Sequence, residues 1–287
     1  MRLARLALLA ALLPGAALAQ DRVAAIGGDV TEIVYRLGQQ GRLVARDTTS
    51  TFPPEALALP DLGYLRALSP EGVLAMEPDL VLMSADAGPP ETLAALESAG
   101  VTMVTVPETP SVEGVGARIA TIADALGVPE AGRALRAEVE AQIEAAIAAA
   151  DPGDAPRPRV LFVLSNSGGR LMGAGEGTAA AAIIAMAGAE NAVSGFSGYK
   201  ALGDEAVAAS APDIVLTMQT GGTRDAVAGT PDEYITHPAL TETPAGKARR
   251  LISLPGGLLL GFGPRTPEAV AALHEAIARA MPAAAGE

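Results

Sequence analysis

The sequence contains no cysteine and no tryptophan, and only four tyrosines, four phenylalanines and two histidines among its 287 residues. The absence of cysteine excludes a disulfide-stabilised scaffold and every thiolate metal site. Because His237 and His274 are the only imidazoles in the chain, a site with several histidine ligands is not expected. A hard metal ion would therefore have to be bound through oxygen ligands.

Positive charge is scarce as well. The chain has 20 Lys and Arg against 33 Asp and Glu, which gives a formal net charge of −13. Nucleic acids and anionic membrane surfaces reward clustered positive charge, so neither is expected as a partner. Apolar residues make up 49 % of the chain, enough for a buried core. The length lies near the ~250–300 residues at which a single core stops growing, so two lobes are predicted.

Residues 1–19 have the pattern of a secretory signal peptide. Two arginines precede an apolar run over residues 6–13, and Ala17-Leu18-Ala19 provides a small-x-small cleavage site. The run is shorter than the ~20 residues that span a bilayer, and no cysteine stands at the cleavage point for lipid attachment. We therefore expect a soluble periplasmic protein that is not lipidated.

Strand and helix signals alternate along the rest of the chain, which favours an α/β fold with parallel-type sheets. Short strands are predicted at residues 23–26, 43–45, 79–83, 101–106, 160–164 and 213–218, and a Gly-rich turn follows the fifth of them. Helices are predicted from Asp29, after Pro90, and over 129–150, 178–187 and 267–280. Asp29 and Glu32 have the spacing of a capping box, so helix capping explains both carboxylates.

The longest helical pattern runs from Pro129 to Ala150 and ends in a dense cluster of Pro, Gly and Asp at 151–158. A domain boundary is predicted at this cluster. The expected organisation is a signal peptide at 1–19, an N-terminal lobe at 20–128, a bridging helix and linker at 129–156, and a C-terminal lobe at 157–287.

The second half of the chain resembles the first. The segment GYLRALSPE at 63–71 has a counterpart in GYKALGDE at 198–205, with one residue deleted. Each segment is followed by Pro-Asp and an apolar strand, at Pro78–Leu82 and Pro212–Leu216. The repeat indicates two similar lobes with a cleft between them.

Tyr64 is the residue whose setting suggests ligand chemistry. Ligands bind at the loops that follow the strands of open α/β sheets, and none of those loops places a nucleophile beside a base. Tyr64 lies between two predicted strands, with Arg66 two positions on. A tyrosinate is one axial ligand of haem iron, and a nearby guanidinium favours the charged phenol. On chemistry alone, a tyrosine half-buried at the lobe surface is an equally good interpretation.

The sequence resembles the periplasmic haem-binding proteins of ABC-type haem importers, within a larger group that also binds siderophores and cobalamin. The resemblance extends along nearly the whole chain. It is carried by GGDVTEIV at 27–34, DTTSTFP at 47–53, GYLRALS at 63–69 and LLGFGPR at 259–265. It implies two Rossmann-like lobes bridged by a single long helix, and ferric haem b as the transported ligand. It also implies that Tyr64 is the axial ligand and that Arg66 hydrogen-bonds its phenolate.

The same resemblance implies delivery to an ABC permease dimer with its ATPase, through one acidic residue on each lobe. Glu71 and Glu205, which are partners in the repeat, occupy those positions. A carboxylate in the first turn of a helix is also favoured by the helix dipole, so docking is not its only explanation.

The resemblance does not identify the residues that would contact the haem propionates. By position, Arg170, Lys200 and Arg224 are the cations on the side of the cleft, and Tyr199 stands beside Lys200 in the place that mirrors Tyr64. Some relatives stack two haems with a histidine of the second lobe. The segment Ser165–Gly169 has no histidine, so one haem per monomeric chain is expected.

Two other functions stay open. The same fold could carry a ferric siderophore or a corrinoid, although those ligands bring their metal already coordinated and need no protein phenolate. An exported α/β hydrolase or dehydrogenase would need a nucleophile, a base and an orienting group within reach of one another, and the cleft loops offer none.

Overall fold

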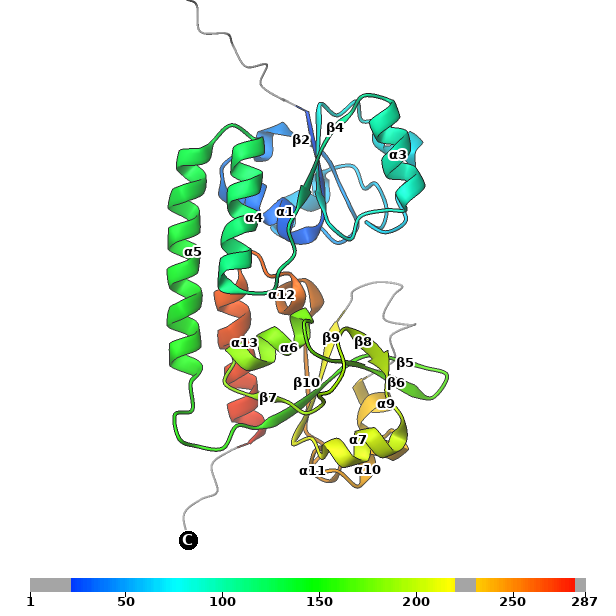
Figure 1. Cartoon of the computed structure of the whole chain (residues 1–287), viewed down its shortest axis with the longest axis vertical. Helices are drawn as coiled ribbons and strands as arrows, with labels where there is room; N and C mark the ends of the chain where they lie inside the picture. The colour runs from blue at the N-terminus through cyan, green and yellow to red at the C-terminus, as the bar shows by residue number, and fades with distance from the viewer. Residues whose placement is uncertain (1–21, 220–230, 282–287) are drawn as a thin grey trace, which may run out of the picture.

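The computed structural model describes residues 22–219 and 231–281. It is an α/β structure with two lobes, each built on its own sheet and joined along one side by a long helix (Figure 1). The predicted two-lobed fold is confirmed.

The N-terminal lobe has a four-stranded parallel sheet in the order β2-β1-β3-β4. Its strands are β1 (Val23–Ile26), β2 (Leu43–Arg46), β3 (Leu80–Ser84) and β4 (Thr102–Val106). Every residue of β1 and β3 is buried, as expected for central strands with helices on both faces. The helices of this lobe are α1 (Gly28–Arg36), α2 (Pro70–Leu74), α3 (Pro90–Ser98) and α4 (Val112–Ala125).

The long helix α5 (Pro129–Ala150) has the predicted bounds and packs against α4 and the last helix of the chain (Figure 1). Its buried residues Leu135, Val139 and Ile143 recur every four positions and so form one apolar stripe. Near its start, a Cβ on Gly132 would lie 2.3 Å from the Ala123 Cβ. Glycine at this position therefore allows α5 to approach α4 closely.

The C-terminal lobe has a mixed sheet rather than a wholly parallel one. Its order is β10-β9-β5-β6-β8, and β7 pairs with β5. The strands are β5 (Arg159–Ser167), β6 (Arg170–Ala174), β7 (Glu190–Asn191), β8 (Tyr199–Ala201), β9 (Ile214–Gln219) and β10 (Leu251–Pro255). The expected Gly-rich turn is the tip of an antiparallel β5–β6 hairpin, because Gly168 and Gly169 both adopt positive φ there.

Seven helices of the C-terminal lobe lie in the described residues. They are α6 (Ala179–Met186), α7 (Asp204–Ser210), α9 (Pro231–Ile235), α10 (Pro238–Thr241), α11 (Pro244–Lys247), α12 (Gly256–Leu260) and α13 (Thr266–Ala280). A single buried apolar cluster runs from β1 through α4 and α5 to β5 and α13, and contains Val23, Ile119, Val139, Phe162 and Ile277. The two lobes therefore share one continuous core along the bridging helix.

The internal repeat has a structural counterpart. In each lobe a short helix, α2 or α7, precedes a Pro-Asp turn and a central strand, β3 or β9. The carboxylates of Asp79 and Asp213 accept hydrogen bonds from the backbone N–H of Arg22 and Arg159, at 3.2 and 2.9 Å. Arg22 directly precedes β1 and Arg159 is the first residue of β5, so the same contact joins the repeat to the sheet in both halves.

Both copies of the turn contain a non-glycine residue with positive φ, Glu77 at 45° and Ala211 at 40°. Left-handed backbone costs an L-residue about 1–2 kcal/mol, and glycine avoids that cost. We expect Ala211→Gly to raise the free energy of unfolding by about 1 kcal/mol in chemical denaturation. The control is Ala208→Gly inside α7, where the same exchange should lower stability by a similar amount. A loss of stability in both variants would contradict the prediction.

Four buried or nearly buried charged residues join the lobes. Arg118 of α4 donates hydrogen bonds to the Asp29 carboxylate and to the backbone oxygen of Gly261, both at 2.7 Å. Arg265, between α12 and α13, donates to the two oxygens of Glu32 at 3.0 and 2.5 Å. The predicted capping box is therefore wrong: no side chain caps α1, and both carboxylates bind arginines far along the chain.

Candidate functional site

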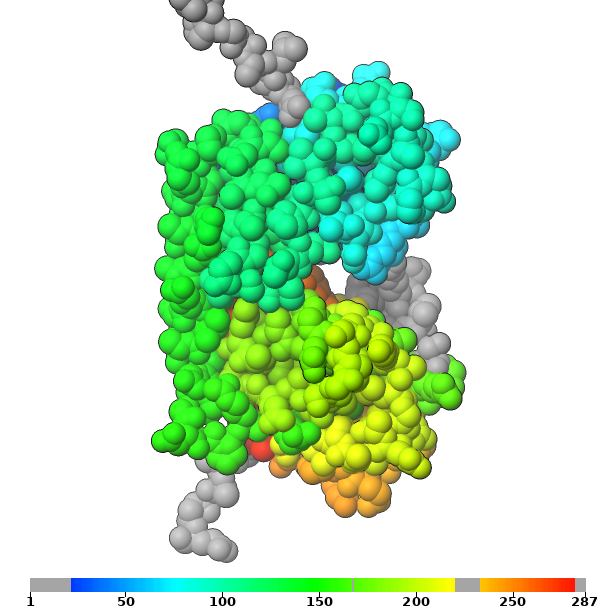
Figure 2. Space-filling view, viewed as in Figure 1, coloured from blue at the N-terminus to red at the C-terminus, as the bar shows by residue number. Residues whose placement is uncertain are grey.

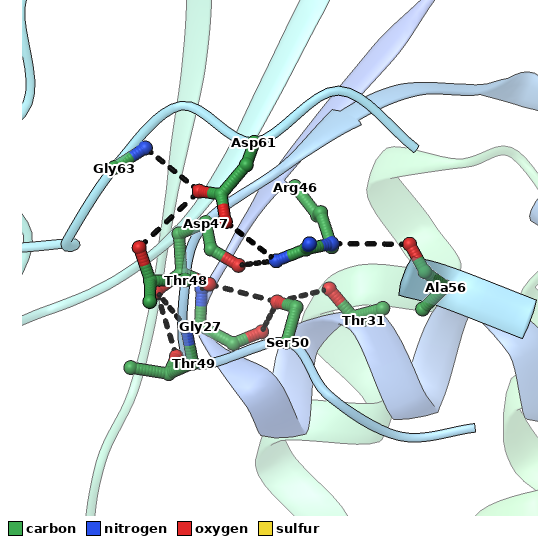
Figure 3. A network of polar contacts seen from close by, with 10 residues as sticks. All are labelled: Gly27, Thr31, Arg46, Asp47, Thr48, Thr49, Ser50, Ala56, Asp61 and Gly63. Carbon is green, nitrogen blue, oxygen red and sulfur yellow. Dashed lines mark hydrogen bonds and ion pairs between the residues drawn. The ribbon is translucent and has the colours of Figure 1, made fainter. Parts of the chain in front are cut away.

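The gap between the lobes opens on the side away from α5 (Figure 2). The loop after β2 is held by the carboxylate of Asp47, which has no exposed surface. Asp47 accepts hydrogen bonds from the Gly27 N–H at 3.0 Å, the Ser50 hydroxyl at 2.7 Å and the Thr49 N–H at 2.9 Å (Figure 3). A carboxylate with this many donors fixes the loop relative to the start of α1.

A second carboxylate, Asp61, fixes the segment that leads to Tyr64. It accepts hydrogen bonds from Arg46 Nη1 at 3.0 Å, the Thr48 hydroxyl at 3.2 Å and the Gly63 N–H at 2.9 Å (Figure 3). The Thr48 N–H also donates to the Gly63 oxygen at 2.9 Å. The residue before Tyr64 is thus tied to the loop after β2 by its own backbone.

Tyr64 is half-buried, and its phenol oxygen lies 3.5 Å from Nη1 of Arg66. The segment forms a turn, in which the Ala67 N–H donates to the backbone oxygen of Tyr64 at 2.7 Å. This turn brings the side chains of Tyr64 and Arg66 together.

Asp86, which no sequence motif singles out, joins this pair. Arg66 Nη2 forms an ion pair with Asp86, from the loop after β3. Burial acts to lower the pKa of Arg66, but the hydrogen bond from Arg66 to Asp86 and the charge of Tyr64 outweigh it and raise that pKa above its usual value. The guanidinium therefore stays protonated beside the phenol, where its N–H groups can only donate.

Tyr199 of β8 faces this group from the other lobe. Its ring packs edge-on against Phe162, with centroids 6.4 Å apart. Burial raises the pKa of Tyr199, while the Ala180 backbone at the start of α6 and the charge of Arg66 act to lower it.

Of the three cations predicted to contact the propionates, two lie in the described residues. Lys200 follows Tyr199 on β8 and so points to the opposite face of the sheet, where its Nζ lies 5.6 Å from the Phe196 ring centroid. Arg170 is exposed at the tip of the β5–β6 hairpin. Arg224 lies outside the described residues.

Glu71 and Glu205 are exposed in the first turns of α2 and α7. The Ser69 hydroxyl donates to Glu71 at 3.0 Å. Helices α2 and α7 pack against α3 and α10, which lie clear of α5 on their respective lobes (Figure 1). The two predicted docking residues thus occupy equivalent places of the repeat.

The histidines take no part in this site. His237 is buried: its Nδ1 caps α10 and its Nε2 lies 3.0 Å from the Gly169 oxygen. It lines a pocket in the C-terminal lobe with residues that include Asp204 and Glu233, and Tyr64 and Arg66 do not line that pocket. In the described ranges no group of three His, Asp or Glu side chains could hold a metal ion. Over those ranges, too, the helices are too short or too polar to cross a membrane.

Solved structures of periplasmic heme-binding proteins are similar to this chain. The chain shares 47 % sequence identity with the periplasmic heme-binding protein BhuT, whose structure holds two hemes; 90 % of this chain and 98 % of that one align, with a TM-score of 0.83. For the periplasmic heme-binding protein RhuT from Roseiflexus sp. RS-1, in apo form, the identity is 39 %, the coverage 91 % and 99 %, and the TM-score 0.84.

A curated relative has a different ligand. The cobalamin-binding protein of Halobacterium salinarum is 29 % identical over 213 residues, which are 72 % of this chain and 56 % of that protein. This chain therefore spans a little over half the length of that relative. A family model described as "Periplasmic binding protein" matches residues 23–258. With a match over most of its length and the two-lobed fold described above, the chain belongs to the periplasmic binding protein family.

Proposed function

We propose that this protein captures ferric haem between its lobes, with the phenolate of Tyr64 as axial ligand, and delivers it to an ABC permease. The observation that carries the proposal is the half-buried Tyr64 phenol 3.5 Å from Arg66, on a segment fixed by Asp61. A tyrosinate ligates haem iron, and a cation beside it would stabilise the negative oxygen of the iron-bound tyrosinate. The heme-binding relatives support the same ligand.

A corrinoid is the second candidate, because the relative from Halobacterium salinarum is named for cobalamin. Nothing about Tyr64 and Arg66 favours it, since a corrinoid brings its metal already coordinated and needs no protein phenolate. An enzymatic function is not proposed: the Ser50 and Thr49 hydroxyls that donate to Asp47 fix the loop after β2, and no histidine base lies beside them in the described part of the chain.

The experiment that tests the proposal is a titration of the purified protein with hemin, followed by visible absorption. We expect a saturable high-spin ferric spectrum at neutral pH, and no saturable change when cyanocobalamin or a ferric hydroxamate siderophore replaces hemin. Saturation with cyanocobalamin and only the spectrum of free hemin in the parallel titration would reject haem as the cargo.

The same titration measures stoichiometry. The sequence predicts one haem per chain because residues 165–169 contain no histidine, whereas the structure of the BhuT relative holds two hemes. We propose one haem, held by Tyr64. An end point at two equivalents of hemin would contradict that number without affecting the choice of cargo.

Delivery is proposed to use Glu71 and Glu205, exposed at equivalent helix starts of the two lobes. We expect Glu71→Arg with Glu205→Arg to abolish haem uptake by cells that depend on this importer, because each change places like charges opposite the arginines of the permease. Hemin binding by the purified variant should stay unchanged. The control is Glu91→Arg with Glu190→Arg, which reverses one exposed charge on each lobe elsewhere. Unchanged uptake in the first variant would reject this docking surface.

Localisation follows from this role. We propose export through a cleavable signal peptide over residues 1–19, without lipidation, to the periplasm, where a monomeric carrier would meet its permease. Mass spectrometry of the protein from a periplasmic extract tests this, with an N-terminus at Gln20 as the expected result.

A further inference from the structure

The contact between Asp86 and Arg66 does not follow from the positions of the two residues in the chain. The guanidinium uses different nitrogens for its two partners: Nη2 pairs with the Asp86 carboxylate, and Nη1 lies 3.5 Å from the Tyr64 phenol. Arg66 therefore bridges a phenol and a carboxylate. In an exposed location such an ion pair contributes little to stability, and both side chains are about half exposed, at 57 % and 51 %.

The backbone around the pair is nevertheless fixed. The Gly88 N–H donates to the Leu65 oxygen at 2.8 Å, and the Leu68 N–H donates to the Gly88 oxygen at 2.9 Å. These bonds join the loop that carries Asp86 to the turn that carries Arg66. The Asp86 N–H also donates to the Ser84 hydroxyl at 3.2 Å. These backbone hydrogen bonds hold the Asp86 carboxylate beside the Arg66 guanidinium. The contact therefore differs from a transient ion pair between two mobile side chains at the surface.

Binding of haem at Tyr64 would change the surroundings of this pair. A ferric porphyrin core carries one positive charge, which the Tyr64 phenolate neutralises. The macrocycle would also displace water from the phenol and from Arg66 beside it. In a drier site a charge without a counter-charge is costly, whereas a paired charge is favoured more than in water. Once the phenolate is neutralised by iron, Arg66 needs a second anion.

Two anions lie near Arg66. Asp86 contacts the Arg66 guanidinium directly. Glu108 accepts a hydrogen bond from Ser84, and its charge makes the smallest contribution among the causes that act on the pKa of Arg66. We propose that Asp86 is a positioning residue for haem binding, which holds Arg66 beside the Tyr64 phenolate and balances its charge beneath the bound haem. This role rests on the proposed function.

The test is a double-mutant cycle on hemin affinity with Asp86→Asn, Arg66→Ala and both together. We expect Asp86→Asn alone to weaken hemin binding about tenfold, within the range typical of the loss of a residue that supports a metal ligand. In the Arg66→Ala background the carboxylate has lost its cation. Adding Asp86→Asn there should leave affinity unchanged or improve it.

The reduction potential of the bound haem provides a readout that a merely structural role would not move. A negative charge near the iron stabilises the ferric state, so Asp86→Asn should shift the potential to more positive values. Asp86→Glu, which keeps the charge, should restore most of the potential and the affinity. Glu91→Gln, which removes an exposed carboxylate from α3 of the same lobe, should change neither.

Several outcomes would overturn the inference. Equal losses of affinity from Asp86→Asn in both backgrounds would mean that Asp86 acts independently of Arg66. An unchanged potential and affinity in Asp86→Asn would mean that it does not act at all. In both cases a wild-type protein that binds hemin through Tyr64 would leave the proposed function intact. If the wild type fails to bind hemin, the proposed function and this inference are both rejected.

Discussion

Replacing Tyr64 by phenylalanine is expected to weaken the binding of ferric haem by at least about 100-fold, beyond the 10–100-fold typical of residues that only support a metal ligand. The substitution keeps the aromatic ring and removes only the oxygen that would bind iron. Because Asp61 and Thr48 hold the backbone of Gly63 and not the ring of Tyr64, the loop should keep its conformation. Hemin titration measures the effect, together with loss of the tyrosinate charge-transfer band.

The matched controls remove a phenol elsewhere. Tyr35→Phe changes α1 of the same lobe, and Tyr199→Phe changes the tyrosine that faces Arg66 across the gap. Both should keep the charge-transfer band, because Tyr199 has its hydroxyl at the start of α6. Loss of the band in Tyr199→Phe with retention in Tyr64→Phe would place the axial ligand on the other lobe and reject our assignment.

Replacing Arg118 by methionine is expected to lower the free energy of unfolding by about 3–5 kcal/mol, the usual cost of breaking a buried ion pair. The Arg118 side chain is 6 % exposed and that of its partner Asp29 is 12 % exposed. The variant leaves the Asp29 carboxylate and the Gly261 oxygen without this donor. Chemical denaturation measures the loss, and Arg36→Met is the control, since its pair with Glu138 is exposed and should contribute under ~1 kcal/mol.

The pH dependence of the stability of the Arg118→Met variant shows whether the loss comes from the unpaired buried charge of Asp29 or from lost packing. Burial already raises the pKa of Asp29 above 3.8 in the folded wild type, and the Arg118 charge acts to lower it. Without Arg118 that pKa must rise further, so the folded variant binds a proton more readily than the unfolded chain. Its stability should therefore recover, relative to the wild type, as pH falls from 7.5 towards 5. A deficit that stays constant over this range would indicate lost packing alone.

Much of the fold could be predicted from the sequence because its signals are local. The apolar runs at 23–26 and 160–164 and the pattern at 129–150 predicted β1, the centre of β5 and the whole of α5. The strands β6 and β8 were missed. Each is short and lies among glycines, and β8 is exposed throughout, so neither carries the apolar run by which a buried strand is recognised.

The residues of the candidate site likewise fall into those that the sequence predicted and those that it did not. Tyr64 and Arg66 are two positions apart, so a motif contains both. Asp86 is 20 residues from Arg66 and meets it only because β3 returns the chain to the same edge of the sheet. The sequence around a charged residue that follows a strand does not identify the residue with which it will pair in the folded protein.

The sequence by itself determined the α/β alternation, the repeat of the two lobes, the bridging helix and the Tyr-x-Arg segment, since each depends on residues close together in the chain. Only the tertiary structure decided how the lobes are joined. Arg118 pairs with Asp29 of its own lobe across 89 residues and also donates to Gly261 of the other lobe, and Glu32 meets Arg265 across 233 residues. The spacing of Asp29 and Glu32 satisfies a local capping rule, but buried carboxylates bind the cations that folding brings to them. The physical reason is desolvation: removal from water makes a counter-charge necessary, and the sequence does not specify which segment will supply it.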